Sequence, residues 1–241
     1  MRVQRLHDWN LAPRDAMALQ RELAALVVAR GDPPERAVRF VAGCDVAFEK
    51  ARDRAVGAVV VIRYPELDVV ERVVVESSIA FPYVPGLLSF RETPLLAQAF
   101  EQLEHTPDLV MVDGHGYAHP RRFGIACHIG VLLGVPTIGV AKSRLVGEEG
   151  AVAASRGSRA DLVDAGAVIG SLLRTRDGVR PIYVSVGHQI ALDAAEHWVL
   201  RCARAHRLPE PTRLADQLAG EAKRVGVAAA RESGTMGRRS D

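Results

Sequence analysis

The sequence predicts an α/β protein with a mixed central sheet and helices on both faces. Three strand-like runs follow one another between residues 38 and 79 with only short turns between them, which is typical of an antiparallel meander. After residue 92, helical and strand-like runs alternate, which is typical of strands joined by crossover helices. Apolar residues make up 48% of the 241 residues, so the chain has enough of them to build a full core.

The first half is predicted to hold one helix and the meander. Residues 14–30 show apolar side chains at helical spacing, and Gly31, Asp32 and two prolines stop the pattern. The three strands are expected at residues 38–49, 55–64 and 69–79, with turns at residues 52–54 and 65–66. A loop rich in proline and aromatic residues, at residues 81–91, ends this half.

The second half is predicted to alternate. Thr93 is expected to cap a helix whose first residue is Pro94. A buried strand then ends on Asp113, a helix is expected at residues 121–134, and a strand at residues 136–141 leads to Lys142. Residues 144–158 are expected to be a surface loop. The remaining strands are expected at residues 167–174 and 182–186, and the remaining helices at residues 191–204 and 212–225.

Composition limits the class of protein. The net charge is only +2, so bulk charge does not indicate nucleic acid and local clusters must do so. The three cysteines show no metal-binding spacing, which predicts buried free thiols in a reducing compartment. Neither a signal peptide nor an apolar run of about 18 residues is present, which predicts a cytoplasmic protein without a membrane anchor. We expect a monomer with one domain over residues 1–230 and a disordered tail over residues 231–241.

Two carboxylates suggest a metal site. Asp45 lies inside an apolar run, and Asp113 ends a second one. A single buried carboxylate is explained by an arginine partner or a loop cap, because an unpaired buried charge is costly. Two carboxylates at neighbouring strand ends repel each other unless a cation lies between them, and oxygen ligands suit Mg²⁺ or Mn²⁺. We therefore expect a divalent metal at this edge of the sheet, where ligands bind in open α/β sheets.

Other polar residues have two interpretations each. Glu92 is either an acid favoured at a helix start or a third carboxylate of a hydrolytic metal centre. Lys142 is either a solvated surface lysine or a charge that stabilises a phosphate at a strand end. His119 is either structural or catalytic, since two glycines precede it and two arginines follow it. Arg121 and Arg122 oppose the dipole at the expected helix start, which indicates a compensating phosphate.

Five ordered segments resemble the endonuclease V family. They are VAGCDVAF at residues 41–48, PYVPGLLSFRE at 82–92, DGHGYAHPRRFG at 113–124, GVAKS at 139–143 and RLPEPTR at 207–213. The resemblance extends from about residue 10 to 228. It implies a ribonuclease H-like fold and a Mg²⁺-dependent nuclease that acts on deoxyinosine, the deamination product of deoxyadenosine. It implies cleavage of the second phosphodiester bond on the 3′ side of the lesion, which leaves 3′-hydroxyl and 5′-phosphate ends.

The resemblance also implies roles for particular residues. Asp45, Glu92 and Asp113 would be the metal carboxylates, and His119 and Lys142 would serve the scissile phosphate and its water. Tyr83, flanked by Pro82 and Pro85, would be a wedge between bases, a use that suits a rigid aromatic side chain. The base pocket would be lined through main-chain groups by Gly86, Leu88, Gly114 and Ile125. At Asp216 some family members have a histidine, and an acid there would be a fourth carboxylate near the metals.

Polarity explains how such a pocket would select its base. Hypoxanthine presents an acceptor at O6 and a donor at N1, and adenine presents the reverse at both atoms. A mispaired polar edge costs roughly 1–3 kcal/mol per group. Hydrolysis by metal-activated water would follow, with Glu92 completing the site or a second one about 3.5–4 Å away. Three alternatives remain open: a nuclease of the same fold for branched DNA or hybrids, an inosine-specific ribonuclease, and a non-catalytic nucleic-acid binder.

Overall fold

One large sheet organises the molecule. The computed structural model describes residues 1–49 and 53–230; the expected tail at residues 231–241 lies outside this part, as does Arg52 of the expected first turn. Within these ranges nine strands form one sheet in the order β3-β2-β1-β4-β5-β9-β8-β7-β6. The strands are β1 (Phe40–Glu49), β2 (Arg54–Arg63), β3 (Asp68–Ser78), β4 (Leu109–Asp113), β5 (Thr137–Ala141), β6 (Glu148–Glu149), β7 (Arg159–Asp164), β8 (Ala167–Leu173) and β9 (Ile182–His188).

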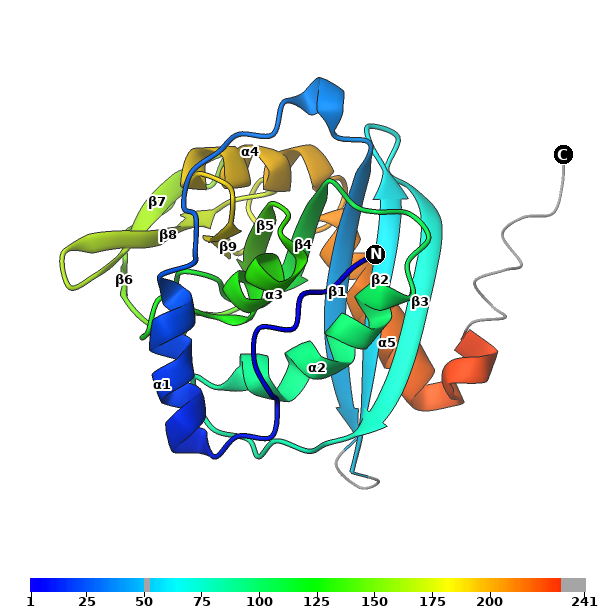
Figure 1. Cartoon of the computed structure of the whole chain (residues 1–241). Coiled ribbons are helices and arrows are strands. Elements are labelled where there is room, and N and C mark those ends of the chain that lie inside the picture. Colours follow the sequence, from blue (N-terminus) through cyan, green and yellow to red (C-terminus); the bar gives the residue numbers. More distant parts are fainter. Residues whose placement is uncertain (50–52, 231–241) are drawn as a thin grey trace, which may run out of the picture.

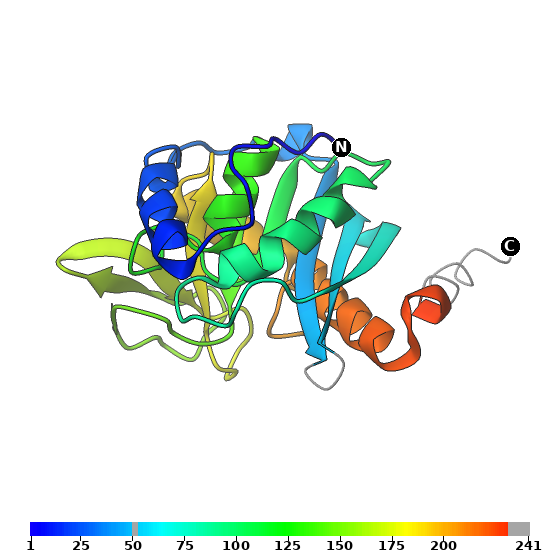
Figure 2. The same cartoon turned by 60° about the horizontal axis from the view of Figure 1, so that its bottom comes forward.

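The sheet is mixed, as predicted. β1, β2 and β3 pair antiparallel and form the expected meander. β4 pairs parallel with β1, and β5 pairs parallel with β4. The other neighbours, β5 with β9 and then β8, β7 and β6, are antiparallel. β1, β4 and β5 therefore run in the same direction. β4 and β5 end beside the middle of β1, at the edge that Figure 2 turns toward the viewer, and β1 continues to Glu49 in a hairpin with β2.

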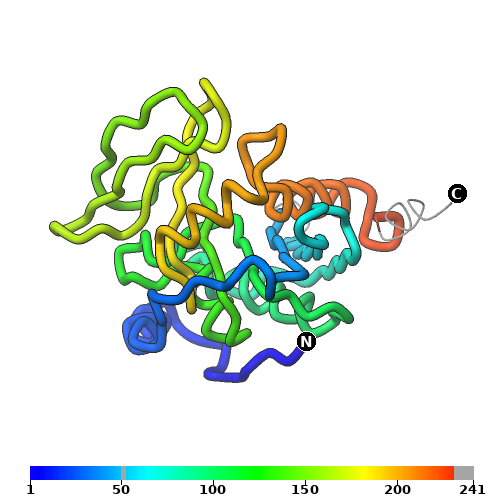
Figure 3. Tube along the Cα trace, turned by 90° about the horizontal axis from the view of Figure 1, so that it is seen from above, coloured from blue at the N-terminus to red at the C-terminus, as the bar shows by residue number. Residues whose placement is uncertain are grey.

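Helices cover both faces, which confirms the predicted class. α2 (Leu88–Glu101) and α3 (Ile125–Leu133) lie on one face, and α4 (Leu192–Cys202) and α5 (Glu210–Val225) lie on the other (Figures 1 and 3). Each face has its own apolar core, and the two cores share no residue. α1 (Pro13–Ala24) packs beside the first face, and a single 3₁₀ turn (Glu35–Ala37) precedes β1. No helix of the described part has the length and hydropathy that a membrane crossing requires.

Three predicted helix boundaries were wrong. α1 ends at Ala24 rather than residue 30, and beyond it the Val28 amide donates to Nδ1 of His188 at 3.3 Å. α2 begins at Leu88 rather than Pro94, because Leu87 and Phe90 are anchored in a small apolar cluster and start the helix earlier. Pro94 therefore lies inside the helix. α3 begins at Ile125 rather than residue 121, since Arg122 adopts a positive φ of 56° that a helix does not accept.

Strands were missed in the region after residue 144. The expected surface loop contains the two-residue strand β6, and β7 follows it where no strand was predicted. Every residue of β7 except Leu162 is at least partly exposed, and Leu162 packs into a small apolar cluster. The region therefore carries little apolar periodicity. Figure 1 shows β7 and β8 as a hairpin that extends beyond the main body of the sheet.

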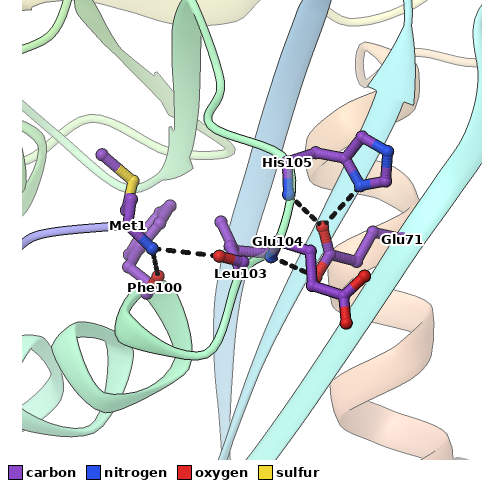
Figure 4. A network of polar contacts seen from close by, with 6 residues as sticks. All are labelled: Met1, Glu71, Phe100, Leu103, Glu104 and His105. Carbon is purple, nitrogen blue, oxygen red and sulfur yellow. Dashed lines mark hydrogen bonds and ion pairs between the residues drawn. The ribbon is translucent and has the colours of Figure 1, made fainter.

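The end of α2 is fastened to the edge strand of the meander. The Glu71 carboxylate on β3 accepts hydrogen bonds from the amides of Glu104 and His105 at 2.8 and 2.9 Å, and it contacts His105 Nδ1 at 3.0 Å (Figure 4). The Met1 amino group donates to two carbonyls at the end of the helix, those of Phe100 and Leu103. These contacts hold α2, the helix that carries Glu92, against the sheet.

Candidate active site

Three carboxylates meet where β4 and β5 end beside the middle of β1. Asp45 was expected at a strand end, but β1 continues beyond it to Glu49, paired with β2. Cys44 on β1 is paired in register with Val112 on β4, so the next residues, Asp45 and Asp113, are neighbours. Asp216 reaches the same place from α5, which covers the face of the sheet opposite to α2 and α3. One oxygen of each carboxylate lies within 4.8 Å of the others. The expected proximity of Asp45 and Asp113 is present, and Asp216, the least certain candidate, is the third member.

A glycine allows α5 to come this close. A Cβ atom at Gly43 would lie 2.0 Å from the carbonyl carbon and oxygen of Pro211 and 2.6 Å from the Thr212 amide nitrogen. Pro211 and Thr212 are fully enclosed residues in the first turn of α5. The backbone of β1 therefore touches the backbone of the helix directly. This contact sets the depth of α5 and brings Asp216 to the carboxylates.

Lys142 is the cation beside these acids. It directly follows β5, whose Val140 is paired with Asp113. Its Nζ lies 2.6 Å from Asp113 Oδ2 and 3.1 Å from Asp216 Oδ1. Burial opposes its charge, but the hydrogen bonds and charges of Asp113 and Asp216 outweigh burial and raise the pKa of Lys142. The lysine is therefore a charged group held at the site, with 42% of its side chain exposed.

Glu92 lies deeper than the other acids. It lies inside α2 rather than at the helix start, and it is only 7% exposed. It is not a member of the three-carboxylate group. Burial raises its pKa well above the ordinary value, and the charges of Asp45 and Asp113 raise it further. Glu92 is thus near enough for the charges of Asp45 and Asp113 to shift its pKa, and it is more deeply buried than either of them.

Negative charge exceeds positive charge in this group, because Lys142 is the one cation in contact with it among the ion pairs of the described residues. Burial, followed by the charge of Asp113, raises the pKa of Asp45 to about 7, and Asp216 adds to the shift while Lys142 opposes it. Burial also raises the pKa of Asp113, although the hydrogen bond from Lys142 lowers it. Four acids in and around one spot, of which Lys142 contacts two, fit a hard divalent cation with oxygen ligands. The chemistry of this donor set therefore matches the metal that the sequence predicts.

These raised pKa values make metal-free stability depend on pH. The folded pKa of Asp45 is about 7, and its unfolded value is about 3.9. The folded state therefore binds more protons between about pH 4 and 7, and its stability falls as pH rises through that window. We expect Asp45→Asn to raise Tm in chelator at about pH 8 and to have little effect at about pH 4. Thermal scans with EDTA measure this, and a lower Tm for the variant at the higher pH would contradict it.

A cavity of 170 Å³ opens beside the carboxylates. All four residues expected at a base pocket line it, namely Gly86, Leu88, Gly114 and Ile125, together with Tyr83, Pro85, His119 and others. A cavity of about 150 Å³ is enough for benzene, so this one suits a single aromatic ring system. A Cβ atom at Gly114 would lie 2.5 Å from Ile125 Cγ2, so the glycine keeps this wall open.

The loop in front of the cavity is rigid. Pro85 and Gly86 are the central residues of a turn closed by the bond from the Leu87 amide to the Val84 carbonyl at 2.9 Å. The φ of 78° at Gly86 is that of a type II turn, in which proline precedes glycine. Val84 packs into the apolar cluster behind the loop. Tyr83 points outward instead and is 72% exposed, so an aromatic side chain projects from a fixed base.

His119 belongs to the cavity wall rather than to the carboxylate group. Its Nδ1 accepts a hydrogen bond from the Arg121 amide at 3.1 Å, so its Nε2 carries the proton and donates to the Gly86 carbonyl at 2.9 Å. Burial and the charge of Arg121 lower the pKa of His119 to about 4. The histidine is thus neutral. Its Nε2 holds the Pro85–Gly86 turn in place, and its Nδ1 holds the backbone at Arg121.

The two arginines are engaged within the protein. Arg121 donates to the Gly86 carbonyl at 2.7 Å and to Gln20 at 2.5 Å. Arg122 forms an ion pair with Asp164 at 2.7 Å, which ties the β7–β8 hairpin to this loop. Neither residue lies at the start of α3. The expectation that a phosphate must compensate an unfavourable dipole contact was therefore wrong.

Sequence reasoning missed two residues of this wall. Gln20 is fully buried in α1, and it donates to the carbonyls of Gly86 and Phe123 at 3.1 and 2.6 Å. Its signal was a polar residue on the apolar face of α1, between Ala16 and Leu23. Leu145 lines the cavity and is 45% exposed. A leucine in a polar Gly- and Glu-rich segment was the available signal.

Comparisons with known proteins identify one family over most of the chain. The family model for Endonuclease V matches residues 21–217. Endonuclease V of Gloeobacter violaceus is 53% identical over 213 residues, which cover 87% of this chain and 86% of that protein. The crystal structure of endonuclease V from Streptomyces avermitilis superposes with a TM-score of 0.86 at 42% identity, covering 93% of this chain and 98% of that one. Ciona intestinalis endonuclease V, in complex with a 24mer DNA containing an inosine, superposes with a TM-score of 0.76 at 28% identity, covering 88% and 97% of the two chains.

Proposed function

The chain belongs to the endonuclease V family, and from this membership we infer that it is a DNA-repair endonuclease with a ribonuclease H-like fold that acts on deoxyinosine. One observation supports this function best. The group of Asp45, Asp113 and Asp216 lies at the same sheet edge as a base-sized cavity. A nuclease that selects one altered base needs both features within a few nucleotides of each other.

The carboxylates would hold the metal. We propose Mg²⁺, with Mn²⁺ as a substitute, bound by Asp45 and Asp113, with Asp216 and Glu92 completing the surroundings. A divalent cation there would activate the attacking water and neutralise charge on the scissile phosphate. Lys142 would donate to a phosphate oxygen, because its ammonium already lies at the rim of the group and stays charged. By the family resemblance, the cut falls at the second phosphodiester bond 3′ to the lesion and leaves 3′-hydroxyl and 5′-phosphate ends.

The cavity would read the base mainly through amide groups. The Gly86 carbonyl accepts from Gln20, His119 and Arg121, so it is occupied by three protein donors. A contact from Gly86 to the base therefore falls to its N–H group, which suits the O6 acceptor of hypoxanthine and not the amino group of adenine. Leu88, Gly114 and Ile125 supply the remaining wall. His119 contributes by holding this turn, which is a change from its expected role at the scissile phosphate.

We predict that Tyr83→Ala reduces discrimination between inosine and adenine strands by about 10–100-fold, the loss expected from removing one base-stacking side chain. Tyr83→Phe keeps the ring and should keep the discrimination. The measurement is the ratio of kcat/KM for two oligonucleotides that differ only in that base. Mn²⁺ affinity should be unchanged in both variants, because Tyr83 is not one of the residues proposed to bind the metal. Equal ratios for wild type, Tyr83→Ala and Tyr83→Phe would remove the wedge from this account.

Several finer points belong to the same proposal. We propose that residues 1–230 act as one nuclease domain, which the continuous nine-stranded sheet of the described residues supports. We also propose a monomer in the cytoplasm; three buried free cysteines suit a reducing compartment. Inosine in single-stranded RNA is a second candidate substrate. A non-catalytic binder is disfavoured, because a group of three neighbouring carboxylates repels phosphate unless a cation is bound there.

One assay tests the function. Oligonucleotides with a single inosine, as DNA and as RNA, are incubated with the protein with and without Mg²⁺, beside branched DNA and a DNA–RNA hybrid. We expect metal-dependent cutting of the inosine DNA at the second bond 3′ to the lesion. Cutting of the branched or hybrid substrate in preference to inosine DNA would replace this proposal by the broader nuclease alternative.

A further inference from the structure

The RLPEPTR segment contains an arginine that the proposed mechanism does not use. Arg207 lies in the connection between α4 and α5, nine residues before Asp216 along the chain. Its Nη2 donates to the carbonyls of Lys142 and Pro181, each at 2.9 Å, and its Nε donates to the carbonyl of Arg180 at 3.1 Å. One guanidinium thus joins the end of β5 to the start of β9.

These bonds lie where the strand ladder stops. The last pair between β5 and β9 is Ala141 with Tyr183. Pro181 has no amide hydrogen and cannot extend the ladder by donating. Arg207 supplies hydrogen-bond donors at this point, and one of its acceptors is the backbone of Lys142. The backbone that presents the lysine is therefore held by a side chain from another element.

Further hydrogen bonds hold the backbone of Arg207 and the residue that follows Lys142. The hydroxyl of Thr175, which is fully buried, donates to the Arg207 carbonyl at 2.6 Å. On the other side of Lys142, His115 Nε2 donates to the Ser143 carbonyl at 2.9 Å. The carbonyl groups of residues 142 and 143 thus accept hydrogen bonds from two different side chains, Arg207 and His115. The ammonium of Lys142 can then stay 2.6 Å from Asp113 and 3.1 Å from Asp216.

We propose that Arg207 is a positioning residue for the cleavage step, acting through the backbone of Lys142. This inference rests on the proposed function. The arginine joins the strand end that carries Lys142 to the connection that leads to Asp216, so it fixes the two sides of the lysine–carboxylate contact relative to each other. A lysine in its place has no planar fork of donors and cannot bridge three carbonyls in this geometry.

The test compares Arg207→Gln and Arg207→Lys with a matched control. Arg176→Gln removes an exposed guanidinium that donates to the Ala205 carbonyl in the same α4–α5 connection at 2.9 Å, without contacting Lys142. In single-turnover cleavage of inosine DNA, we expect Arg207→Gln to lower the maximal rate by about 10²-fold with a much smaller change in half-saturating enzyme concentration. Arg207→Lys should fall between wild type and Arg207→Gln. Arg176→Gln should match wild type.

A double-mutant cycle shows whether the effect passes through Lys142. In a Lys142→Met background, adding Arg207→Gln should change the residual rate little, because the group being positioned is already gone. A further loss as large as in the wild-type background would overturn the proposal. Hydrogen–deuterium exchange without metal supplies a second readout, and peptides around residues 137–145 should exchange faster in Arg207→Gln and Arg207→Lys but not in Arg176→Gln.

The outcomes also separate this inference from the proposed function. Failure of the wild-type protein to cut inosine DNA would refute the function, whatever the variants do. Normal cutting by wild type, with Arg207→Lys and Arg176→Gln indistinguishable in rate and exchange, would refute only the role of Arg207. If Arg207→Gln does not fold, Arg207→Lys carries the same comparison.

Discussion

Asp45→Asn is expected to lower the single-turnover rate of inosine-DNA cleavage by at least about 10³-fold, which corresponds to about 4 kcal/mol of transition-state stabilisation. The substitution keeps the size of the side chain and removes its charge. Asp45 belongs to the three-carboxylate group, so the substitution replaces a charged oxygen ligand of the proposed cation by a neutral amide oxygen. Binding of the lesion strand should change far less, since the cavity is lined by other residues.

A surface carboxylate provides the control for this variant. Asp161→Asn makes the same chemical change on β7, where the carboxylate is 47% exposed and pairs with Arg159. It should cut at the wild-type rate. An Asp45→Asn protein that is folded and retains cleavage within about tenfold of wild type would contradict a metal ligand at this position.

Gly43→Ala is expected to give the largest loss of stability. The added Cβ atom would lie 2.0 Å from the Pro211 carbonyl, and both partners are backbone that cannot rotate away. We expect destabilisation of about 3 kcal/mol, the upper part of the usual range for overpacking, and a decrease in Tm of roughly 6–12 °C. α5 must shift outward, so Asp216 leaves the carboxylate group and cleavage should fall as well.

Gly220→Ala is the matched change in the same helix. A Cβ atom there would meet nothing within 4 Å, and an interior helical glycine costs roughly 0.5–1 kcal/mol relative to alanine. We therefore expect a small rise in Tm and unchanged cleavage. Thermal unfolding of the two variants measures the contrast. Similar Tm values for both would show that the β1–α5 backbone contact does not carry this energy.

The strands and helices of the core could be predicted from the sequence because they bury apolar faces. β1, β2 and β3 alternate or run apolar throughout, and their meander was predicted within a few residues. Helix starts were less predictable. Thr93 and Pro94 are a good local start signal, yet tertiary packing of Leu87 and Phe90 starts α2 earlier. Arg122 carries no sequence sign of the positive φ that delays α3.

Some residues of the candidate site could likewise be predicted from the sequence pattern, and others could not. Asp45 could be singled out because it lies inside an apolar run, and Asp113 because it ends one; parallel pairing of the two strands places them together. Asp216 lies on the polar side of α5, where the sequence pattern predicts only a surface acid. Its position beside Asp45 and Asp113 depends on the β1–α5 contact at Gly43, which apolar periodicity does not reveal. The cavity residues were placed by family resemblance rather than by pattern. The Gly86 carbonyl accepts hydrogen bonds from Gln20, His119 and Arg121, and only the tertiary structure brings these three side chains together.

Anomalous diffraction from crystals grown with Mn²⁺ tests the central claim most directly, because it locates the cation without reference to activity. The account predicts a peak between the carboxylates of Asp45 and Asp113, with oxygen ligands at about 2.0–2.6 Å, and loss of that peak in Asp45→Asn. A well-occupied Mn²⁺ elsewhere on the molecule, with the space between Asp45 and Asp113 empty or filled by the Lys142 ammonium alone, would contradict it.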